Sequence, residues 1–290
     1  MERELWPVLY RLVQEVGKDF SQKYVQFHPA TIVLVWLWAV LHDRHLRWAC
    51  DPGNWKTTTL RPHRLPSPST ISRRLYRLPV AFVFRALEQR IRDSQDLGLL
   101  AFLDGKPLPV SGVSQDTDAR RGRGAGGMAK GYKLHAVWAN RPVPEAWEVT
   151  PLPEGETVVG QRLVEQLHAA GYLLGDGNYD ASKLFDAAAQ AGYQLLVPIK
   201  HPHAGNGHHY QSPHRLGCIE RMQFDFARQV YRLRGRIERS FGNATSFAGG
   251  LGPLPAWVRR LRRVRMWVWA KLLINGVRIM KKQGLTSSLQ

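Results

Sequence analysis

Residues 99–105 read LLAFLDG, an apolar run of strand length that closes on Asp104 and a glycine. Residues 172–177 read YLLGDG, where a second apolar run closes on Asp176 and a glycine. Short apolar runs bounded by turn residues are typical of buried β-strands. Side chains at the carboxyl ends of neighbouring parallel strands gather at one edge of a sheet, so we expect these two acids to lie side by side. The alternative for each Asp-Gly pair is a simple turn.

Strand and helix patterns alternate around these two runs. The predicted strands are residues 99–103, 132–138, 146–150, 172–174 and 194–199, and the predicted helices are residues 157–170 and 181–191. Three strands followed by strand–helix crossovers predict an α/β layer architecture, in which the first and fourth strands can be parallel neighbours. Gly192 is the expected helix C-cap. Residues 111–131 predict a mobile, glycine-rich basic loop, although it lacks the ending of a nucleotide-binding loop.

A third acid, Glu238, lies in a helix-like stretch at residues 231–238. On an α-helical wheel Tyr231, Arg234 and Glu238 fall at about 0°, −60° and −20°, on one face. Carboxylates from two strand ends and a helix suit Mg²⁺, which prefers hard oxygen ligands, and paired Mg²⁺ ions are a means of breaking and joining phosphodiesters. The alternative for Glu238 is an ion pair with Arg234 at i,i+4.

The charge of the 290-residue chain is large and unevenly placed. Its net charge is +18, yet residues 99–200 hold 10 Lys/Arg against 11 Asp/Glu, whereas residues 201–290 hold 16 against 3. A near-neutral core with basic flanks favours a polyanionic partner, the alternative being a merely soluble basic surface. Two cysteines, no signal peptide and an apolar run of only residues 31–41 predict a cytosolic protein with no membrane partner.

Residues 1–98 predict a helical region, with helices at residues 6–16, 30–41 and 68–78 and a polar connector between the last two. Ser69 or Thr70 is the expected N-cap of the last helix, whose apolar stripe is Ile71, Leu75 and Leu78. Its other face is basic, so residues 60–78 are a candidate helix-turn-helix that contacts DNA. The alternative is an ordinary amphipathic helix with a solvated face.

Two further segments carry basic or metal-binding residue types. Residues 257–282 hold nine Lys/Arg and no acid, and an apolar stripe from Trp257 through Leu261, Val264, Val268 and Leu272 predicts an amphipathic helix. DNA is the expected partner, with a membrane surface as the alternative. Residues 201–214 hold five histidines. Their spacing is looser than that of most zinc sites, so a polar DNA-facing loop is the prediction and zinc the alternative.

The motifs together resemble one known family. Tyr231-x2-Arg234-x3-Glu238 resembles the Tyr-Arg-Glu signature of bacterial insertion-sequence transposases with a DDE active site. Residues 103–105 and 175–180 look like the first-Asp and second-Asp motifs, and residues 131–135 and 149–151 are similar to the second and third strands of that family. The resemblance covers roughly residues 99–280.

This resemblance implies an RNase H-like mixed sheet flanked by helices, with an all-helical N-terminal region and a basic C-terminal helix. The expected domains are residues 1–98, 99–250 and 251–290. It implies two Mg²⁺ or Mn²⁺ ions held by Asp104, Asp176 and Glu238. It further implies cut-and-paste transposition by a homodimer acting on double-stranded DNA, namely terminal inverted repeats and target DNA, in the bacterial cytoplasm at the nucleoid. The residues expected to contact DNA are Tyr231, Arg234, Arg239, Arg73, Arg74, Arg77, Arg121, Arg123, Lys130, Arg259, Arg262 and Arg263.

One position departs from the family pattern. The usual Lys seven residues after the Glu is Thr245 here, which leaves the metal ligands intact but puts one DNA contact in doubt. No long insertion precedes the Glu238 helix, so a compact member is expected. Two other functions stay open: an RNase H-like nuclease or resolvase without strand transfer, and a non-catalytic DNA-binding repressor.

Overall fold

The computed structural model describes residues 2–21, 23–124, 126–203, 205, 209–247 and 250–286. The chain divides into two compact units, which are described separately. The first unit combines Met1–Gln95, Asn243–Trp257 and Met266–Gln290, and the second combines Asp96–Gly242 and Val258–Arg265. Segments from both ends of the chain therefore build the first unit.

The described part of the first unit is helical. It contains α1 (Glu2–Gly17), η1 (Lys18–Phe20), α2 (Pro29–Leu41), α3 (Leu46–Ala49), η2 (Pro52–Trp55), α4 (Pro68–Arg74) and α5 (Leu78–Arg92). Helix α2 is apolar on all sides and almost completely buried, which is expected of a helix that other helices surround. Three indole rings pack beside it, with ring centroids 4.7 Å apart for Trp6 and Trp38 and 4.5 Å apart for Trp38 and Trp55.

Two local predictions in this unit are wrong. The N-cap of α4 is Ser67, whose hydroxyl accepts a hydrogen bond from the Thr70 amide, so the cap lies before both predicted residues. Helix α4 ends at Arg74, and Leu78 is exposed at the start of α5 instead of continuing the apolar stripe. Ile71 and Leu75 are buried as predicted.

Helix α11 (Leu261–Lys282) differs from the predicted amphipathic tail. Trp257 lies outside it, and from Met266 onward almost every side chain is buried, because this part is a core helix of the first unit. Lys271 is buried there; its ammonium donates to the Val40 carbonyl at 2.9 Å and pairs with Asp43 at 2.8 Å. Burial lowers the pKa of Lys271, and Asp43 opposes that shift.

The second unit is built on a six-stranded mixed sheet, which confirms the α/β prediction. Its strands are β1 (Leu100–Pro109), β2 (Arg120–Gly124), β3 (Gly127–Trp138), β4 (Ala146–Pro151), β5 (Gly171–Leu174) and β6 (Tyr193–Leu196). The order is β2-β3-β1-β5-β6, with β4 also paired to β3. β1 pairs antiparallel with β3 and parallel with β5, so the first and fourth predicted strands are neighbours.

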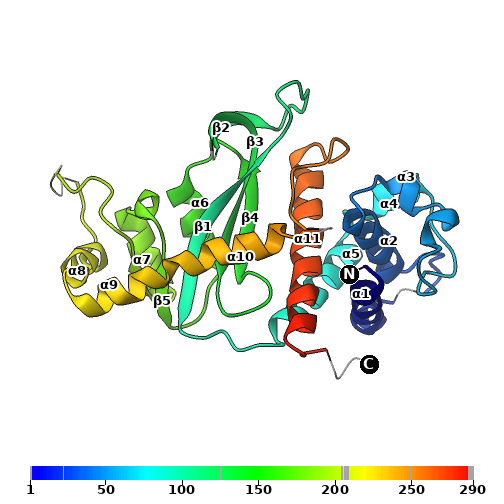
Figure 1. Ribbon diagram of the computed structural model, residues 1–290, viewed down its shortest axis with the longest axis horizontal. Helices are drawn as coiled ribbons and strands as arrows, with labels where there is room; N and C mark the ends of the chain where they lie inside the picture. Colours follow the sequence, from blue (N-terminus) through cyan, green and yellow to red (C-terminus); the bar gives the residue numbers. More distant parts are fainter. Residues whose placement is uncertain are drawn as a thin grey trace. The chain divides into compact units, whose positions relative to one another are not determined.

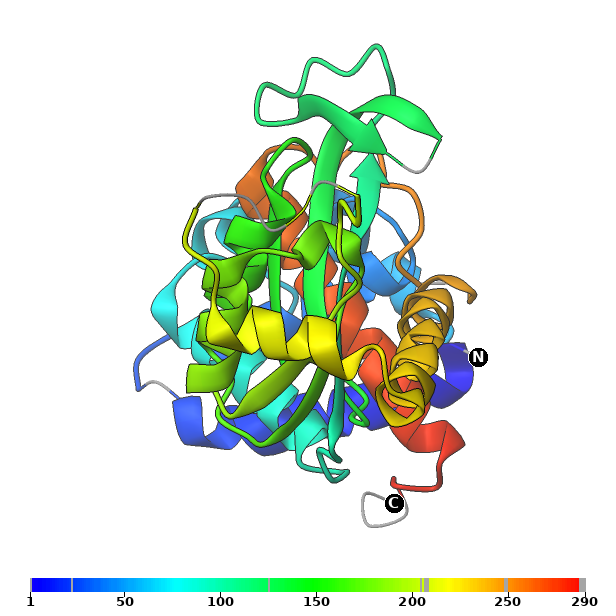
Figure 2. The same cartoon turned by 90° about the vertical axis from the view of Figure 1, so that its left-hand side faces the viewer.

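Helices lie on both faces of this sheet. They are α6 (Glu156–Val164), η3 (Gly177–Tyr179), α7 (Ser182–Gln190), α8 (Pro213–Arg221), α9 (Asp225–Arg232), η4 (Leu233–Gly235) and α10 (Arg236–Thr245). Figures 1 and 2 show α6 and α7 on one face and α10 on the other. Gly192 follows α7 with φ +87°, a left-handed conformation that confirms the predicted C-cap.

The predicted mobile loop at residues 111–131 is largely ordered, because its second half forms the β2–β3 hairpin. The close packing needs glycine: a Cβ on Gly122 would lie 2.8 Å from the Pro153 nitrogen. In the first half, Asp116 accepts hydrogen bonds from the Tyr132 hydroxyl at 2.7 Å and the Arg260 amide at 3.0 Å. Asp116 therefore holds the first half of this segment against β3 and Arg260. The basic, glycine-rich composition of the segment did not predict this role.

Candidate active site

Asp104 lies within β1, and Asp176 lies two residues after the end of the neighbouring parallel strand β5. Phe102 of β1 pairs with Leu174 of β5, and each acid follows its paired residue by two positions. Backbone hydrogen bonds in the ladder fix this register, so the sheet brings the two acid-bearing segments together, and the turn after β5 completes the placement of Asp176. The prediction that the two strands are parallel neighbours is confirmed. The prediction that Asp104 ends its strand is wrong, because β1 continues to Pro109 and Asp104 pairs with Ala136 of β3.

The Asp104 carboxylate is partly buried, with its side chain 23% exposed. It accepts a hydrogen bond from the Gly105 amide at 2.8 Å, and an Arg234 guanidinium nitrogen lies 3.7 Å away. Burial raises the pKa of Asp104, and the charges of Asp176 and Glu156 act in the same direction, while the Gly105 amide and Arg234 oppose them. Negative charge therefore gathers around Asp104, and the nearest cations are Arg234, beside Asp104, and Lys133, which pairs with Glu156.

Asp176 begins the short 3₁₀ turn η3. Its carboxylate accepts the Asn178 amide at 2.9 Å and the Asn178 side-chain amide at 3.4 Å. The carboxylate is thus held as the N-cap of its own turn, a frequent role for Asp. The η3 turn ends at Asp180, whose carboxylate accepts a hydrogen bond from Arg215.

Two tyrosines border the carboxylates. Burial raises the pKa of Tyr179 well above its usual range, and the charges of Glu156, Asp104 and Asp176 add to the shift. Burial also raises the pKa of Tyr231, where Asp176 and Asp104 contribute in the same direction and Arg234 opposes them. Both phenols therefore stay protonated as potential hydrogen-bond donors beside the acids. The Tyr179 hydroxyl and the Arg234 Nε are buried without a hydrogen-bond partner among the described residues.

Glu156 is a further acid that the sequence analysis missed. It lies in the first turn of α6 and pairs with Lys133 of β3 at 2.7 Å. Gly105 leaves little space between its backbone and this ion pair. A Cβ at position 105 would lie 3.0 Å from the Lys133 side chain and 3.5 Å from the Glu156 carboxylate. One indication of this ion pair was present in the sequence: Lys133 lies in residues 131–135, which are similar to the second strand of the transposase family.

A pocket of about 630 Å³ adjoins this part of the sheet. Its wall includes Gly105 of β1, Asn178 of η3, Lys133 and Glu156. Arg123 of the β2–β3 hairpin also lines it, so a residue predicted to contact DNA borders the same hollow as the residues that flank both aspartates.

Glu238 is positioned differently from the two aspartates. The predicted uniform helix over residues 231–238 is wrong, because α9 ends at Arg232 and η4 intervenes before α10 begins at Arg236. A 3₁₀ turn advances about 120° per residue instead of 100°, so the single-face relation of Tyr231, Arg234 and Glu238 no longer follows. Arg234 faces Asp104, whereas Glu238 is exposed on α10 beside the buried Ile237.

No group of three or more His, Cys, Asp or Glu side chains lies within metal-binding reach in the part of the chain that the structure describes. Asp104, Asp176 and Glu238 therefore remain a predicted triad, of which the sheet brings two members together. Among the histidines of residues 201–214, His201, His203, His209 and His214 are exposed, and His208 lies outside the described residues.

The residues predicted to contact DNA lie in both units. In the second unit Arg121 and Arg123 are exposed on β2, while the Lys130 ammonium donates to the Ser114 carbonyl at 2.6 Å. In the first unit Arg73 and Arg77 are exposed, while Arg74 donates to the Phe27 carbonyl. The remaining members, Arg239, Arg259 and Arg262 (exposed) and Arg263 (half-buried), lie on α10 and around the start of α11.

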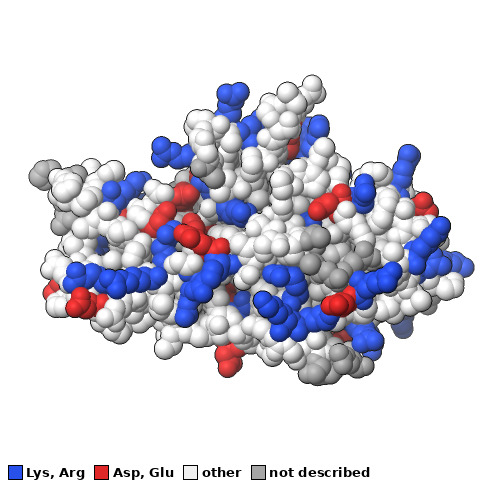
Figure 3. All heavy atoms as spheres, viewed as in Figure 1, with Lys and Arg blue, Asp and Glu red and all other residues white. Residues whose placement is uncertain are grey.

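Acidic and basic side chains gather over different elements of the second unit. Figure 3 shows acidic side chains gathered over the sheet, with Lys and Arg side chains along α9 and α10 beside them. This arrangement suits a polyanion that must approach a carboxylate cluster. No helix among the described residues is long and apolar enough to cross a membrane.

Comparison with known proteins agrees with this geometry. A family model described as "Transposase DDE domain" matches residues 97–274, more than half of the chain. Neither the curated proteins nor the solved structures that were searched gave a match. The matched segment contains the whole mixed sheet and all three predicted acids, and its architecture is that of the RNase H-like fold of these enzymes. The chain therefore belongs to the family of transposases with a DDE domain.

Proposed function

We propose that this protein is an insertion-sequence transposase of the Tyr-Arg-Glu type, which cleaves DNA at the ends of its element and joins them to target DNA. The observation that carries the proposal is that Asp104 and Asp176 each follow, by two residues, the last pair of the parallel strands β1 and β5, inside a segment that matches the transposase family. Cut-and-paste transposition by a homodimer in a bacterial cell completes the proposal.

The donor set at these two aspartates fits a hard divalent cation. Asp104 and Asp176 offer carboxylate oxygens, which Mg²⁺ and Mn²⁺ prefer. Burial chiefly raises the pKa of Asp104, and the charges of Asp176 and Glu156 add to that rise, which a bound cation would oppose. The buried Tyr179 hydroxyl beside them is a donor without a described protein partner. Asp104, Asp176 and, from α10, Glu238 are the proposed ligands. Two bound Mg²⁺ or Mn²⁺ ions would supply charge stabilisation for attacking and leaving oxygens.

Residues around the carboxylates orient the substrate in this proposal. Arg234 lies 3.7 Å from Asp104, and Tyr231 stays protonated beside both aspartates, so both can donate to phosphate oxygens of the scissile strand. The exposed arginines of β2 and α10 suit phosphates that flank the scissile one. Phosphate contacts of this kind provide most of the affinity and little sequence preference.

The proposal is tested by product analysis with the purified full-length chain. Duplexes that carry the inverted repeats flanking the gene are incubated with Mg²⁺, Mn²⁺ or Ca²⁺ and a labelled target. We expect cleavage and joined strands with Mg²⁺ and Mn²⁺, and binding without chemistry with Ca²⁺. Cleavage without joined products would favour a nuclease or resolvase, and metal-independent binding without any cleavage would favour a repressor.

A further inference from the structure

Asp176 lies beyond the sheet ladder that fixes Asp104. The last paired residue of β5 is Leu174, so the position of the Asp176 carboxylate depends on the three-residue turn η3 that follows it. Asp176 is the N-cap of this turn and Asp180 is its C-cap. A short 3₁₀ turn has poor hydrogen-bond geometry of its own, so its shape depends on what holds its far end.

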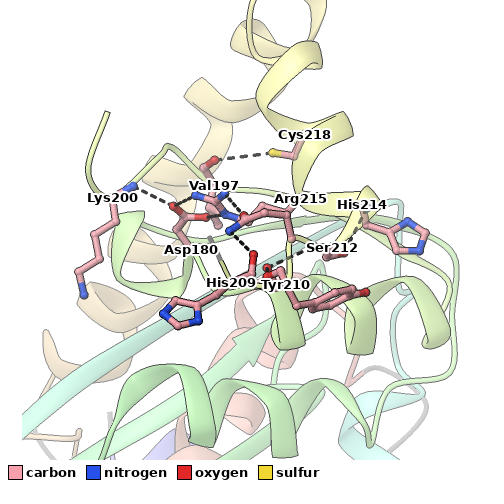
Figure 4. A network of polar contacts seen from close by, with 11 residues as sticks. Asp180, Val197, Lys200, His209, Tyr210, Ser212, His214, Arg215 and Cys218 are labelled. Carbon is pink, nitrogen blue, oxygen red and sulfur yellow. Dashed lines mark hydrogen bonds and ion pairs between the residues drawn. The ribbon is translucent and has the colours of Figure 1, made fainter. Parts of the chain in front are cut away.

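The far end of the turn is clamped by a buried ion pair. Arg215 donates to both oxygens of Asp180, from Nε at 2.6 Å and from a terminal nitrogen at 2.8 Å. The Lys200 amide donates to the same carboxylate at 3.0 Å. The side chains of Asp180 and Arg215 are only 5% and 11% exposed. Figure 4 shows the carboxylate enclosed between the guanidinium and the backbone after β6.

Arg215 is itself held in place. It belongs to α8, and its remaining terminal nitrogen donates to Gln211 at 2.7 Å. The buried N-cap of α8, Ser212, donates to Asp186 of α7 at 2.5 Å. The thiol of Cys218 contacts the Val197 carbonyl at 3.7 Å (Figure 4). Helix α8 is therefore a platform anchored to α7 and to the segment after β6.

We propose that Asp180 and Arg215 form a positioning pair, which fixes the η3 turn and thereby holds the Asp176 carboxylate beside Asp104. This inference rests on the proposed function, because it gives the pair its purpose in cation binding at the two aspartates. A two-pronged guanidinium–carboxylate contact constrains direction as well as distance, which a single hydrogen bond does not. Buried ion pairs contribute little net stability, so a geometric role accounts better for its enclosure.

The test measures Mn²⁺ binding by electron paramagnetic resonance on the full-length chain without DNA, below the unfolding temperature of every variant. Arg215→Lys keeps the charge and loses the two-pronged contact. We expect its Kd for Mn²⁺ to rise about 10- to 100-fold, the usual cost of losing a residue that orients a ligand. Asp180→Asn should have a similar effect. Asp176→Asn is the reference for loss of a proposed ligand.

The matched control is Arg162→Gln. Arg162 also donates two hydrogen bonds to one carboxylate, that of Glu148, at 3.0 and 3.1 Å in the same unit. Arg162 belongs to α6, and the carboxylates that it pairs with, Glu148 and Glu154, lie outside the η3 turn, so Mn²⁺ binding should stay near the parent value. An equal loss in Arg162→Gln would mean that general destabilisation causes the effect, and the proposal would be overturned.

Two outcomes separate this inference from the proposed function. If Asp176→Asn weakens Mn²⁺ binding and the Arg215 and Asp180 variants do not, the positioning role is wrong and the proposed function stands. If Asp176→Asn binds Mn²⁺ like the parent, both are overturned. Asp180→Asn leaves the buried Arg215 guanidinium without its carboxylate, so the double variant Asp180→Asn/Arg215→Gln, which removes both charges, replaces Asp180→Asn if that single variant fails to fold. The double variant should bind Mn²⁺ as weakly as either single variant.

Discussion

The strands β1 and β5 position their acids in a different way from helix α10. Asp104 is placed by the sheet ladder, because its backbone pairs with Ala136 of β3, and Asp176 follows two residues after the last β1–β5 pair, at the start of the η3 turn. Glu238 is placed by the packing of Ile237 and Phe241, after the 3₁₀ turn η4 has changed the helical phase. The strand pair is therefore the preorganised half of the proposed site, and the helix acid is the half that depends on side-chain packing.

The largest expected effect is on catalysis. Asp104→Asn, Asp176→Asn and Glu238→Gln should each lower the rate of DNA cleavage by at least about 100-fold, the size of loss that removing one catalytic group causes. DNA affinity should change little, because Lys and Arg contacts to phosphates provide it. Single-turnover cleavage and filter binding measure the two quantities. Any one of the three variants that cuts at close to the parent rate would remove that residue from the site.

Metal binding to the free protein sharpens the comparison. Asp104→Asn and Asp176→Asn should weaken Mn²⁺ binding at least about tenfold, whereas Glu238→Gln should weaken it by less than about threefold. The reason is that the sheet already brings the segments of both aspartates together, while Glu238 is exposed on α10. Isothermal titration of each variant decides this. An equal loss in all three would show that the helix acid is preorganised too.

Contacts with DNA should divide by region. Arg73 and Arg77 lie in the candidate helix-turn-helix. Replacing either with Ala should reduce the difference in binding free energy between element-end DNA and random DNA by roughly 1–3 kcal/mol. The double variant Arg262→Ala/Arg263→Ala should lower the affinity for both DNAs equally. It should also reduce the slope of log affinity against log salt concentration by about two. Binding to both DNAs across a salt series measures this. Loss of only end-specific binding in the second variant would reverse the assignment.

The helix break between α9 and α10 can be challenged with one methyl group. A Cβ on Gly235 meets no atom within 4 Å, so Gly235→Ala should stabilise the fold by about 0.5–1 kcal/mol and favour a continuous helix. Cleavage should slow, because a continuous helix turns Glu238 away from its present direction. Gly242→Ala, also in open space but beyond the break, should stabilise without slowing cleavage. Equal cleavage rates for the two variants would show that η4 does not position Glu238.

The smallest expected effect is on stability in metal-free buffer. The folded pKa of Asp104 is raised above its ordinary 3.8, mainly by burial, so the folded state binds the proton more tightly than the unfolded state. Stability should therefore fall as pH rises from 3.8 through the raised folded pKa. Asp104→Asn should lack this fall and be the more stable protein at neutral pH. Denaturant unfolding across pH measures it, and an Asn variant less stable at neutral pH would contradict the assigned shift.

The sequence predicted the sheet because apolar runs and their glycine boundaries are local signals. Strand order predicted that the first and fourth strands are parallel neighbours, whereas their register is seen only in the structure. The β2 strand was missed because its residues, RRGRG, lack β-forming side chains, and packing of Gly122 against the backbone after β4 explains its presence. The 3₁₀ turn at η4 has no comparable local signal.

Long-range contacts explain the remaining differences. The second half of α11 looked like a basic amphipathic tail, but other helices of the first unit surround it and bury even Lys271, which Asp43 neutralises. Arg215 and Asp180 are 35 residues apart in the chain, and neither lies in a pattern that pairs them. Spacing along the chain therefore predicts which acids strand register brings together, but not the pairs that support them.

The central claim is that Asp104 of β1 and Asp176, which follows β5, form a divalent-cation site. The most direct measurement is a crystal structure of the full-length chain with Mn²⁺, using anomalous scattering to locate the ions. We expect an anomalous peak bonded to carboxylate oxygens of both Asp104 and Asp176, at a distance of about 2.0–2.4 Å. Mn²⁺ bound only elsewhere, such as at His201 and His203, with both aspartates unligated, would contradict the claim.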